Sequence, residues 1–179
     1  MTTGEGPIEP PDLALVVFLQ SVERSVVDAY DRVLPLLGDS AKPAVVKVQA
    51  HHKDYVDALG KLPGTAAVPT ANQTLAFVLA ARLQAMTDEK SALTVAFGIE
   101  NQLSETYGFA FTTVTSPDVV NLLATLMPVV STHAAALAGL AVLPTASAFP
   151  NGPFEGTTVA GAENTDAKAG FDPAAFPVG

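Results

Sequence analysis

Residues 20–30 (QSVERSVVDAY) and residues 97–107 (FGIENQLSETY) carry the same pattern of residues. When the first segment is shifted by 77 positions, Glu23 falls on Glu100 and Tyr30 falls on Tyr107. Apolar residues in both segments recur every three or four positions, which is typical of an α-helix with one buried face. The shared pattern therefore predicts two copies of one helical unit.

The segments that follow these two helices also match, at a spacing of 81 positions. His52 falls on His133, and the pair Leu62-Pro63 falls on Leu143-Pro144. A helix followed by a second helix, twice over, predicts two helical hairpins related by an approximate twofold axis. We therefore expect an all-α protein, an antiparallel four-helix bundle built from two helical hairpins.

Capping residues, prolines and glycines place the long helices at about 12–37, 39–60, 87–113 and 116–143. A shorter helix over about 71–85 is expected in the connection between the two hairpins. The side chains expected to cap the first, third and fourth long helices are those of Asp12, Thr87 and Ser116.

The expected bundle spans residues 12–143, between an N-terminal arm (1–11) and a C-terminal tail (144–179) rich in Pro and Gly. The tail lacks helical periodicity, so we expect an irregular segment that lies over the bundle. Its candidate anchors are four phenylalanines: Phe149, Phe154, Phe171 and Phe176.

Each long helix carries one ionisable residue within its apolar face, and these residues are Glu23, His52, Glu100 and His133. A buried ion that has lost its partner costs about 3–5 kcal/mol. The four groups are therefore expected to pair with one another, to bind a metal ion or to change protonation. His51 points about a third of a turn away from its neighbour, so we expect it at the surface or rim. Tyrosines in the core need a partner for the hydroxyl, and this applies to Tyr30, Tyr55 and Tyr107.

Charge and composition exclude several classes of function. A net charge of -9 repels phosphate backbones, so no nucleic-acid partner is expected. The absence of cysteine excludes disulfides, thiolate metal sites and cysteine nucleophiles. The sequence contains no nucleophilic triad, phosphate loop or dinucleotide fingerprint. We therefore assign no catalytic residue, and the sequence does not favour an enzyme.

The chain is apolar, with 49% hydrophobic and 15% charged residues. Such a composition predicts apolar surface to cover, in a homodimer or as a subunit of a larger protein assembly. Residues 119–154 lack Asp, Glu, Lys and Arg, but polar residues and a proline interrupt them, so we expect a core helix and no membrane span. Residues 1–12 show no signal peptide, which predicts a cytoplasmic protein, or an exported one if a leader was removed.

Glu on the first helix of each hairpin and His on the second is the pattern of the ferritin-like carboxylate-bridged di-iron proteins. The segments QSVE (20–23), HH (51–52), GIEN (98–101) and STHA (131–134) resemble the divergent bacterial group of ferritin-like domains. The resemblance covers about residues 12–143. It implies a ferritin-like four-helix bundle with a metal site at Glu23, His52, Glu100 and His133.

Two positions depart from the family pattern, in which the second helix of each hairpin carries Glu-x-x-His. Gln49 and Val130 stand where the bridging carboxylates are expected. The resemblance then implies a degenerate di-iron site, with no metal or with one divalent ion (Fe, Mn or Zn) per chain. We expect a structural or binding role without ferroxidase activity. The alternative is a single-metal or di-iron protein that binds metal or acts on oxygen or peroxide.

Overall fold

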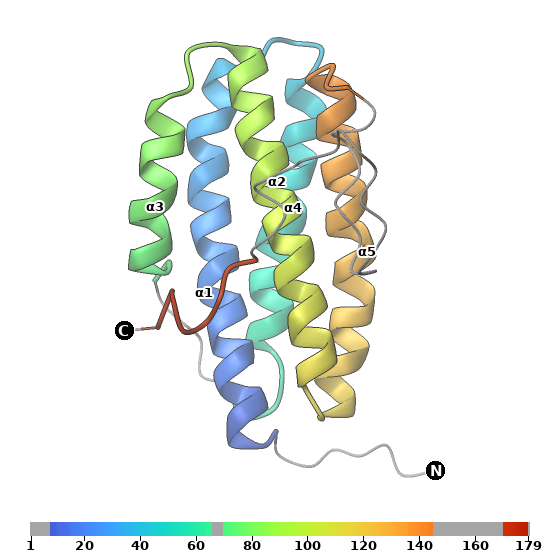
Figure 1. Cartoon of the computed structure of the whole chain (residues 1–179). Helices are drawn as coiled ribbons and strands as arrows, with labels where there is room; N and C mark the ends of the chain where they lie inside the picture. Colours follow the sequence, from blue (N-terminus) through green and yellow to red (C-terminus); the bar gives the residue numbers. More distant parts are fainter. Residues whose placement is uncertain (1–7, 66–69, 145–169, 179) are drawn as a thin grey trace, which may run out of the picture.

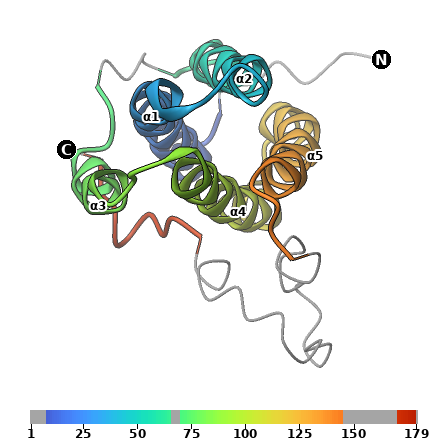
Figure 2. The same ribbon diagram turned by 90° about the horizontal axis from the view of Figure 1, so that it is seen from above.

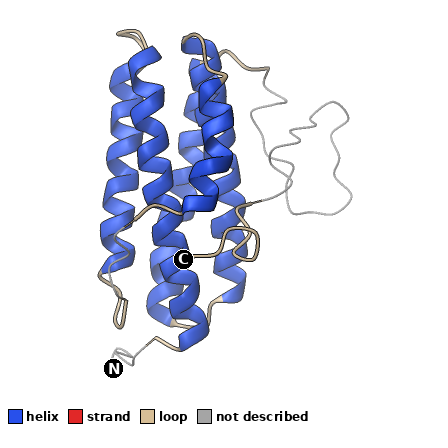
Figure 3. Cartoon of the chain, turned by 90° about the vertical axis from the view of Figure 1, so that its left-hand side faces the viewer, coloured by secondary structure: helices blue, strands red, loops and turns tan. Residues whose placement is uncertain are grey.

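The computed structural model describes residues 8–65, 70–144 and 170–178. Its long helices are α1 (Pro10–Val33), α2 (Lys42–Gly60), α4 (Glu89–Thr113) and α5 (Pro117–Leu140), and a shorter helix, α3 (Gln73–Gln84), precedes α4 (Figure 1). The described residues include no strand (Figure 3). The expected all-α bundle is confirmed.

The bundle consists of two antiparallel hairpins, α1 with α2 and α4 with α5 (Figure 1). Seen from above, these four helices surround a common centre, and α3 lies outside them beside α1 and α4 (Figure 2). The core fills the space between the helices, and its fully buried side chains include Leu19, Val22, Leu59, Ile99, Leu103 and Leu137. Four helices therefore present one side each to the same interior.

Three expected helix caps differ from those in the structure. Helix α1 begins at Pro10, so Asp12 lies in its first turn and is not its cap. The Asp12 carboxylate accepts hydrogen bonds from the backbone N–H groups of Thr115 (2.9 Å) and Ser116 (2.6 Å), between α4 and α5. Helix α4 is capped by Asp88, one residue after the expected Thr87. Asp12 therefore joins the start of the first hairpin to the turn of the second.

The third correction concerns α5, because Ser116 precedes it without making the expected side-chain cap.

The connection between the two helices of the first hairpin is longer than expected. Pro35 has no N–H for the helical ladder, and α1 ends at Val33 in a short 3₁₀ turn, Leu34–Leu36. Helix α2 then begins at Lys42.

Helix α3 forms within the expected connection and packs against the bundle. The Asn72 side chain caps it by accepting a hydrogen bond from the backbone N–H of Leu75 at 3.0 Å. Leu75 and Leu79 are 0% and 1% exposed. Burying a leucine side chain stabilises a fold by about 1.5–3 kcal/mol, so these two residues attach α3 to the bundle.

The described end of the tail, residues 170–178, also lies on the bundle. The backbone N–H of Phe171 donates to the Thr106 hydroxyl at 2.7 Å, and the Asn72 amide donates to the Phe176 carbonyl at 2.8 Å. The two phenylalanine rings pack edge to face with centroids 5.9 Å apart. Phe171 and Phe176 thus serve as anchors, whereas the predicted anchors Phe149 and Phe154 lie outside the described residues.

Helix α5 is long and apolar enough, by length and composition, to cross a membrane, with a mean hydropathy of 1.5. A core helix of a soluble protein passes the same test. In this structure, the residues of α5 that face the bundle are buried, among them Leu123, Val130 and Leu137.

Candidate metal centre

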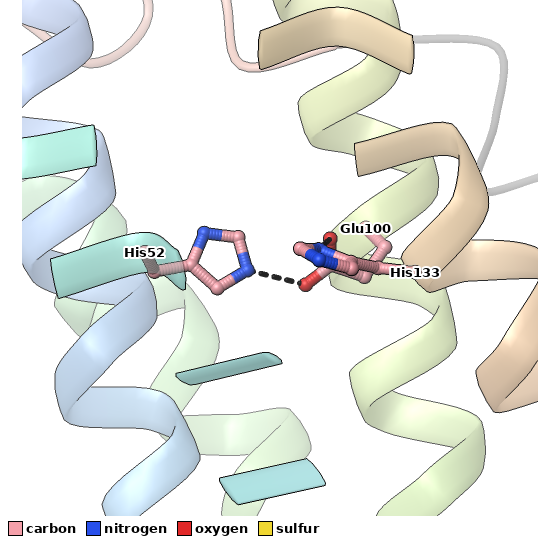
Figure 4. Close-up of side chains that lie close together, drawn as sticks. All are labelled: His52, Glu100 and His133. Atoms are coloured by element: carbon pink, nitrogen blue, oxygen red, sulfur yellow. Dashed lines mark hydrogen bonds and ion pairs between the residues drawn. The ribbon is translucent and has the colours of Figure 1, made fainter. Parts of the chain in front are cut away.

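The four ionisable residues singled out in the sequence meet at the centre of the bundle. Glu23 (α1), His52 (α2) and Glu100 (α4) are 0% exposed, and His133 (α5) is 5% exposed. His52 approaches from one side, and Glu100 and His133 approach from the other (Figure 4). Each long helix contributes one group because each residue occupies an apolar position of its helix.

Three of these side chains are arranged as a ligand set. One ligating atom each from His52, Glu100 and His133 lies within 4.8 Å of the other two. His52 Nε2 is 2.8 Å from Glu100 Oε1, and His133 Nδ1 is 3.2 Å from Glu100 Oε2. The donor set of two imidazoles and one carboxylate suits Zn²⁺, Mn²⁺ or Fe²⁺. The residues present therefore fit a single divalent ion.

Glu23 occupies a different place in the arrangement. Its Oε2 atom lies 2.7 Å from Nδ1 of His52, on the ring nitrogen opposite the one that faces Glu100. Its other oxygen accepts a hydrogen bond from the Tyr107 hydroxyl. Glu23 is thus part of the same buried cluster, and its two oxygens contact His52 and Tyr107. The ligand role of the four residues stays a prediction.

One tyrosine from each hairpin donates a hydrogen bond to the buried glutamate of the other hairpin. Tyr30 donates to Glu100 Oε1 at 2.6 Å, and Tyr107 donates to Glu23 Oε1 at 2.5 Å. Burial and the neighbouring carboxylates raise the pKa of both tyrosines well above the ordinary value, so both remain hydrogen-bond donors. The repeat predicted that both rings are in the core. It did not predict that each hydroxyl bonds the glutamate of the other hairpin.

His51 is closer to the site than its place in the helix suggested. Its side chain is half-buried, and its Nδ1 atom lies 2.9 Å from Nε2 of His133. The two rings stack with centroids 5.1 Å apart. Burial, followed by the nearby His133 and Lys47, lowers the pKa of His51. The signal that sequence reasoning undervalued was the adjacent pair of histidines itself.

His52 and Glu100 perturb each other strongly. Burial alone would lower the pKa of His52, but Glu100 and Glu23 outweigh it and raise this pKa to about 10. Burial alone would raise the pKa of Glu100, but His52 and His133 outweigh it and lower this pKa to about 2. Without a metal, His52 is therefore an imidazolium held between two carboxylates at neutral pH.

The residues at the two positions that depart from the family pattern face other partners. The Gln49 amide donates to the Val27 carbonyl at 3.1 Å and to Asp31 Oδ1 at 2.7 Å. Its oxygen accepts from Lys53 at 3.2 Å. Val130 is 0% exposed and has no ligating atom. Neither residue adds a charge to the cluster.

Tyr55 lies beside the cluster, one turn after His52 on α2. Its ring is edge-on to His52 and roughly parallel to His133, with centroids 5.5 and 6.4 Å away. Burial and the carboxylates of Glu23 and Glu100 raise its pKa above the ordinary value. Its hydroxyl is buried and has no hydrogen-bond partner among the residues that the structure describes.

A four-helix bundle with glutamates and histidines converging on its centre defines a class of protein, the ferritin-like bundles. Comparison with families agrees, because residues 12–142 match the ferritin-like domain. The chain belongs to this family. Comparisons with curated proteins and with solved structures find no match.

Proposed function

We propose that this protein binds one divalent metal ion per chain, through His52, Glu100 and His133, and that it does not act as a ferroxidase. The observation that carries the proposal is the convergence of three buried ligating atoms within 4.8 Å of one another. Histidine and carboxylate ligands in this number suit a mononuclear site that keeps an open coordination position.

The charge of the cluster supports one ion. Glu23 and Glu100 bring two negative charges into the core, and both are fully buried. In the metal-free protein the His52 imidazolium compensates one of these charges. A divalent ion with a neutral His52 compensates both, so its binding displaces the His52 proton. Two ions would leave an uncompensated positive charge in a dry interior.

Each proposed ligand is also held by a second side chain. Tyr30 donates to Glu100, and His51 contacts the outer nitrogen of His133. Glu23 contacts the outer nitrogen of His52. Such outer contacts fix the orientation of a ligand and the ring nitrogen that carries its proton, and they are typical of metal sites in proteins. Within this proposal, Glu23 orients His52 and is not itself a ligand.

Gln49 and Val130 support the proposed absence of ferroxidase activity. Iron pairs in ferritin-like bundles are held by a Glu-x-x-His on each of two helices. Gln49 is engaged with α1, and Val130 offers no oxygen or nitrogen atom. A second ion would therefore lack its bridging carboxylates.

A metal-free scaffold is the second candidate. It is favoured by the two short contacts of His52, 2.7 Å to Glu23 and 2.8 Å to Glu100. These contacts already satisfy both ring nitrogens without a metal. The buried ion pairs would then stabilise a bundle whose role is structural.

Metal analysis of matched variants separates the two candidates. Glu100→Gln removes one ligand charge, whereas Glu105→Gln makes the same change outside the cluster on the same helix. Under the metal proposal, the first variant binds whichever of Zn²⁺, Mn²⁺ and Fe²⁺ the wild type holds at least about 100-fold more weakly, a loss of about 2.7 kcal/mol. The second variant binds as wild type does. Equal metal content in the two variants, or none in wild type, favours the scaffold.

We also propose that the protein associates, as a homodimer or within a larger assembly. The support is apolar side chains left in solvent, Phe77 at 81% exposed and Phe109 at 53%. Sedimentation at several concentrations tests this, and a monomer at every concentration argues against a homodimer.

A further inference from the structure

The Tyr55 hydroxyl differs from the other polar groups of the central cluster, because it is buried and bonds nothing within residues 8–65, 70–144 and 170–178. The hydroxyls of Tyr30 and Tyr107 each donate to a glutamate. Both ring nitrogens of His52 and of His133 have partners as well. An unsatisfied buried hydroxyl costs about 1–3 kcal/mol, and such groups are rare in native proteins. A hydroxyl so placed can bond a small species that is not part of the chain.

The position of Tyr55 suggests where this species lies. The ring is edge-on to one proposed ligand, His52, and roughly parallel to another, His133. Three protein ligands leave a fourth position of a tetrahedral ion for water or for another small ligand. Glu23 lies outside the group of three converging ligands, and its two oxygens contact His52 and Tyr107, so within this proposal the position is left to a small ligand.

We propose that the Tyr55 hydroxyl hydrogen-bonds a small ligand, water or a small anion, at the open coordination position of the metal. This inference rests on the proposed metal site and adds the class of small molecule that the metal would bind there. Tyr55 is a positioning residue for that ligand. The phenol donates a hydrogen bond to an anion, and it donates to or accepts from water. A phenol donor beside a metal favours oxygen- or nitrogen-donor anions over neutral apolar molecules.

The experiment uses the full-length protein loaded with Co²⁺, whose visible spectrum reports coordination geometry, and azide as the anionic probe. Tyr55→Phe removes only the unpartnered hydroxyl, so the variant is expected to fold and to bind Co²⁺ within about 3-fold of wild type. We expect altered visible bands and azide binding about 10-fold weaker, about 1.4 kcal/mol.

Tyr30→Phe is the matched comparison, because its hydroxyl bonds a proposed ligand directly. It should weaken Co²⁺ binding itself, which Tyr55→Phe should not. If Tyr55→Phe binds Co²⁺ with an unchanged spectrum and unchanged azide affinity, the role of Tyr55 is overturned and the metal site stands. If wild type binds no Co²⁺, both the metal site and this inference are overturned.

Discussion

Tyr107 donates a hydrogen bond to Glu23 across the bundle, between residues separated by 84 positions in the chain. The reciprocal bond runs from Tyr30 to Glu100, over 70 positions. Each hairpin therefore supplies the donor for the buried glutamate of the other. These two bonds join the hairpins and stabilise the negative charges of the buried glutamates.

Replacing Tyr107 by Phe is expected to destabilise the protein by about 1.5–3 kcal/mol, because a buried carboxylate loses a hydrogen bond to its charge. Equilibrium unfolding in urea measures the loss. In the metal-free protein Tyr55→Phe is the control, since the Tyr55 hydroxyl bonds no residue that the structure describes. Equal stabilities for Tyr107→Phe and wild type would show that the cross-hairpin bond contributes nothing.

Asp12 is expected to make stability depend on pH. Burial raises its pKa, but hydrogen bonds from Ser116 and Thr115 outweigh burial and leave the pKa below 3.8, the value for the unperturbed group. The unfolded chain therefore takes up the Asp12 proton at higher pH than the folded protein. The contribution is fully present above pH 3.8 and is lost as the pH falls through the lowered pKa of the folded protein.

The measurement compares wild type with Asp12→Ala by unfolding at several pH values. The variant should be about 1–3 kcal/mol less stable near neutral pH, because three hydrogen bonds are lost with the carboxylate. The difference should shrink only below about pH 4. A difference that is constant down to pH 2 contradicts this role of Asp12.

The buried side-chain amide of Asn101 is expected to lower the free energy of unfolding. The Asn101 side chain is 0% exposed, and within the described part of the chain neither its oxygen nor its nitrogen has a hydrogen-bond partner. Asn101→Leu, of similar size, should stabilise the fold by about 1–2 kcal/mol. Gln102→Leu is the control, because it loses a 2.7 Å bond to Arg82 and should not stabilise. Thermal unfolding decides, and a destabilised Asn101→Leu shows that the amide has a partner in solution.

Gly170 allows the tail to approach α4 closely. A Cβ atom at this position would lie 2.8 Å from the backbone nitrogen of Thr106. Gly170→Ala should therefore displace residues 170–178 and expose the buried Phe171 ring, with a loss of about 1.5–3 kcal/mol for one uncovered aromatic side chain. Proteolysis of the tail and urea unfolding measure the effect.

The control for the tail is Gly108→Ala, since a Cβ atom at Gly108 would meet nothing within 4 Å. Alanine is a better helix former there by about 0.8–1.0 kcal/mol, so this variant should be stabilised. A Gly170→Ala protein as stable and as protease-resistant as wild type would show that the close approach is unimportant.

The architecture could be predicted because the internal repeat carries matching polar residues as well as matching apolar positions. Glu23 and Glu100, like His52 and His133, occupy apolar positions of their helices, and this places them in one interior. Helix starts were less predictable, because several side chains near a start can act as caps. Asp12 has the right chemistry for a cap, but tertiary structure assigns it to the Thr115–Ser116 turn.

The finer geometry of the site depends on distances across the bundle that no local pattern contains. Helical spacing placed His51 away from the centre, yet its ring reaches His133 on the neighbouring helix α5. The spacing of residues along the helices also predicted equivalent roles for Glu23 and Glu100. In the structure Glu100 lies between two histidines, whereas Glu23 contacts one. The asymmetry arises from side-chain packing and not from the repeat.

Metal stoichiometry tests the central claim most directly. Purified protein is loaded separately with Zn²⁺, Mn²⁺ and, in air, Fe²⁺, then desalted and analysed for metal per chain by mass spectrometry. We predict one ion per chain for at least one of the three metals, and never two. Two irons per chain with the absorption of a bridged di-iron centre would contradict the account, and so would the absence of all three metals.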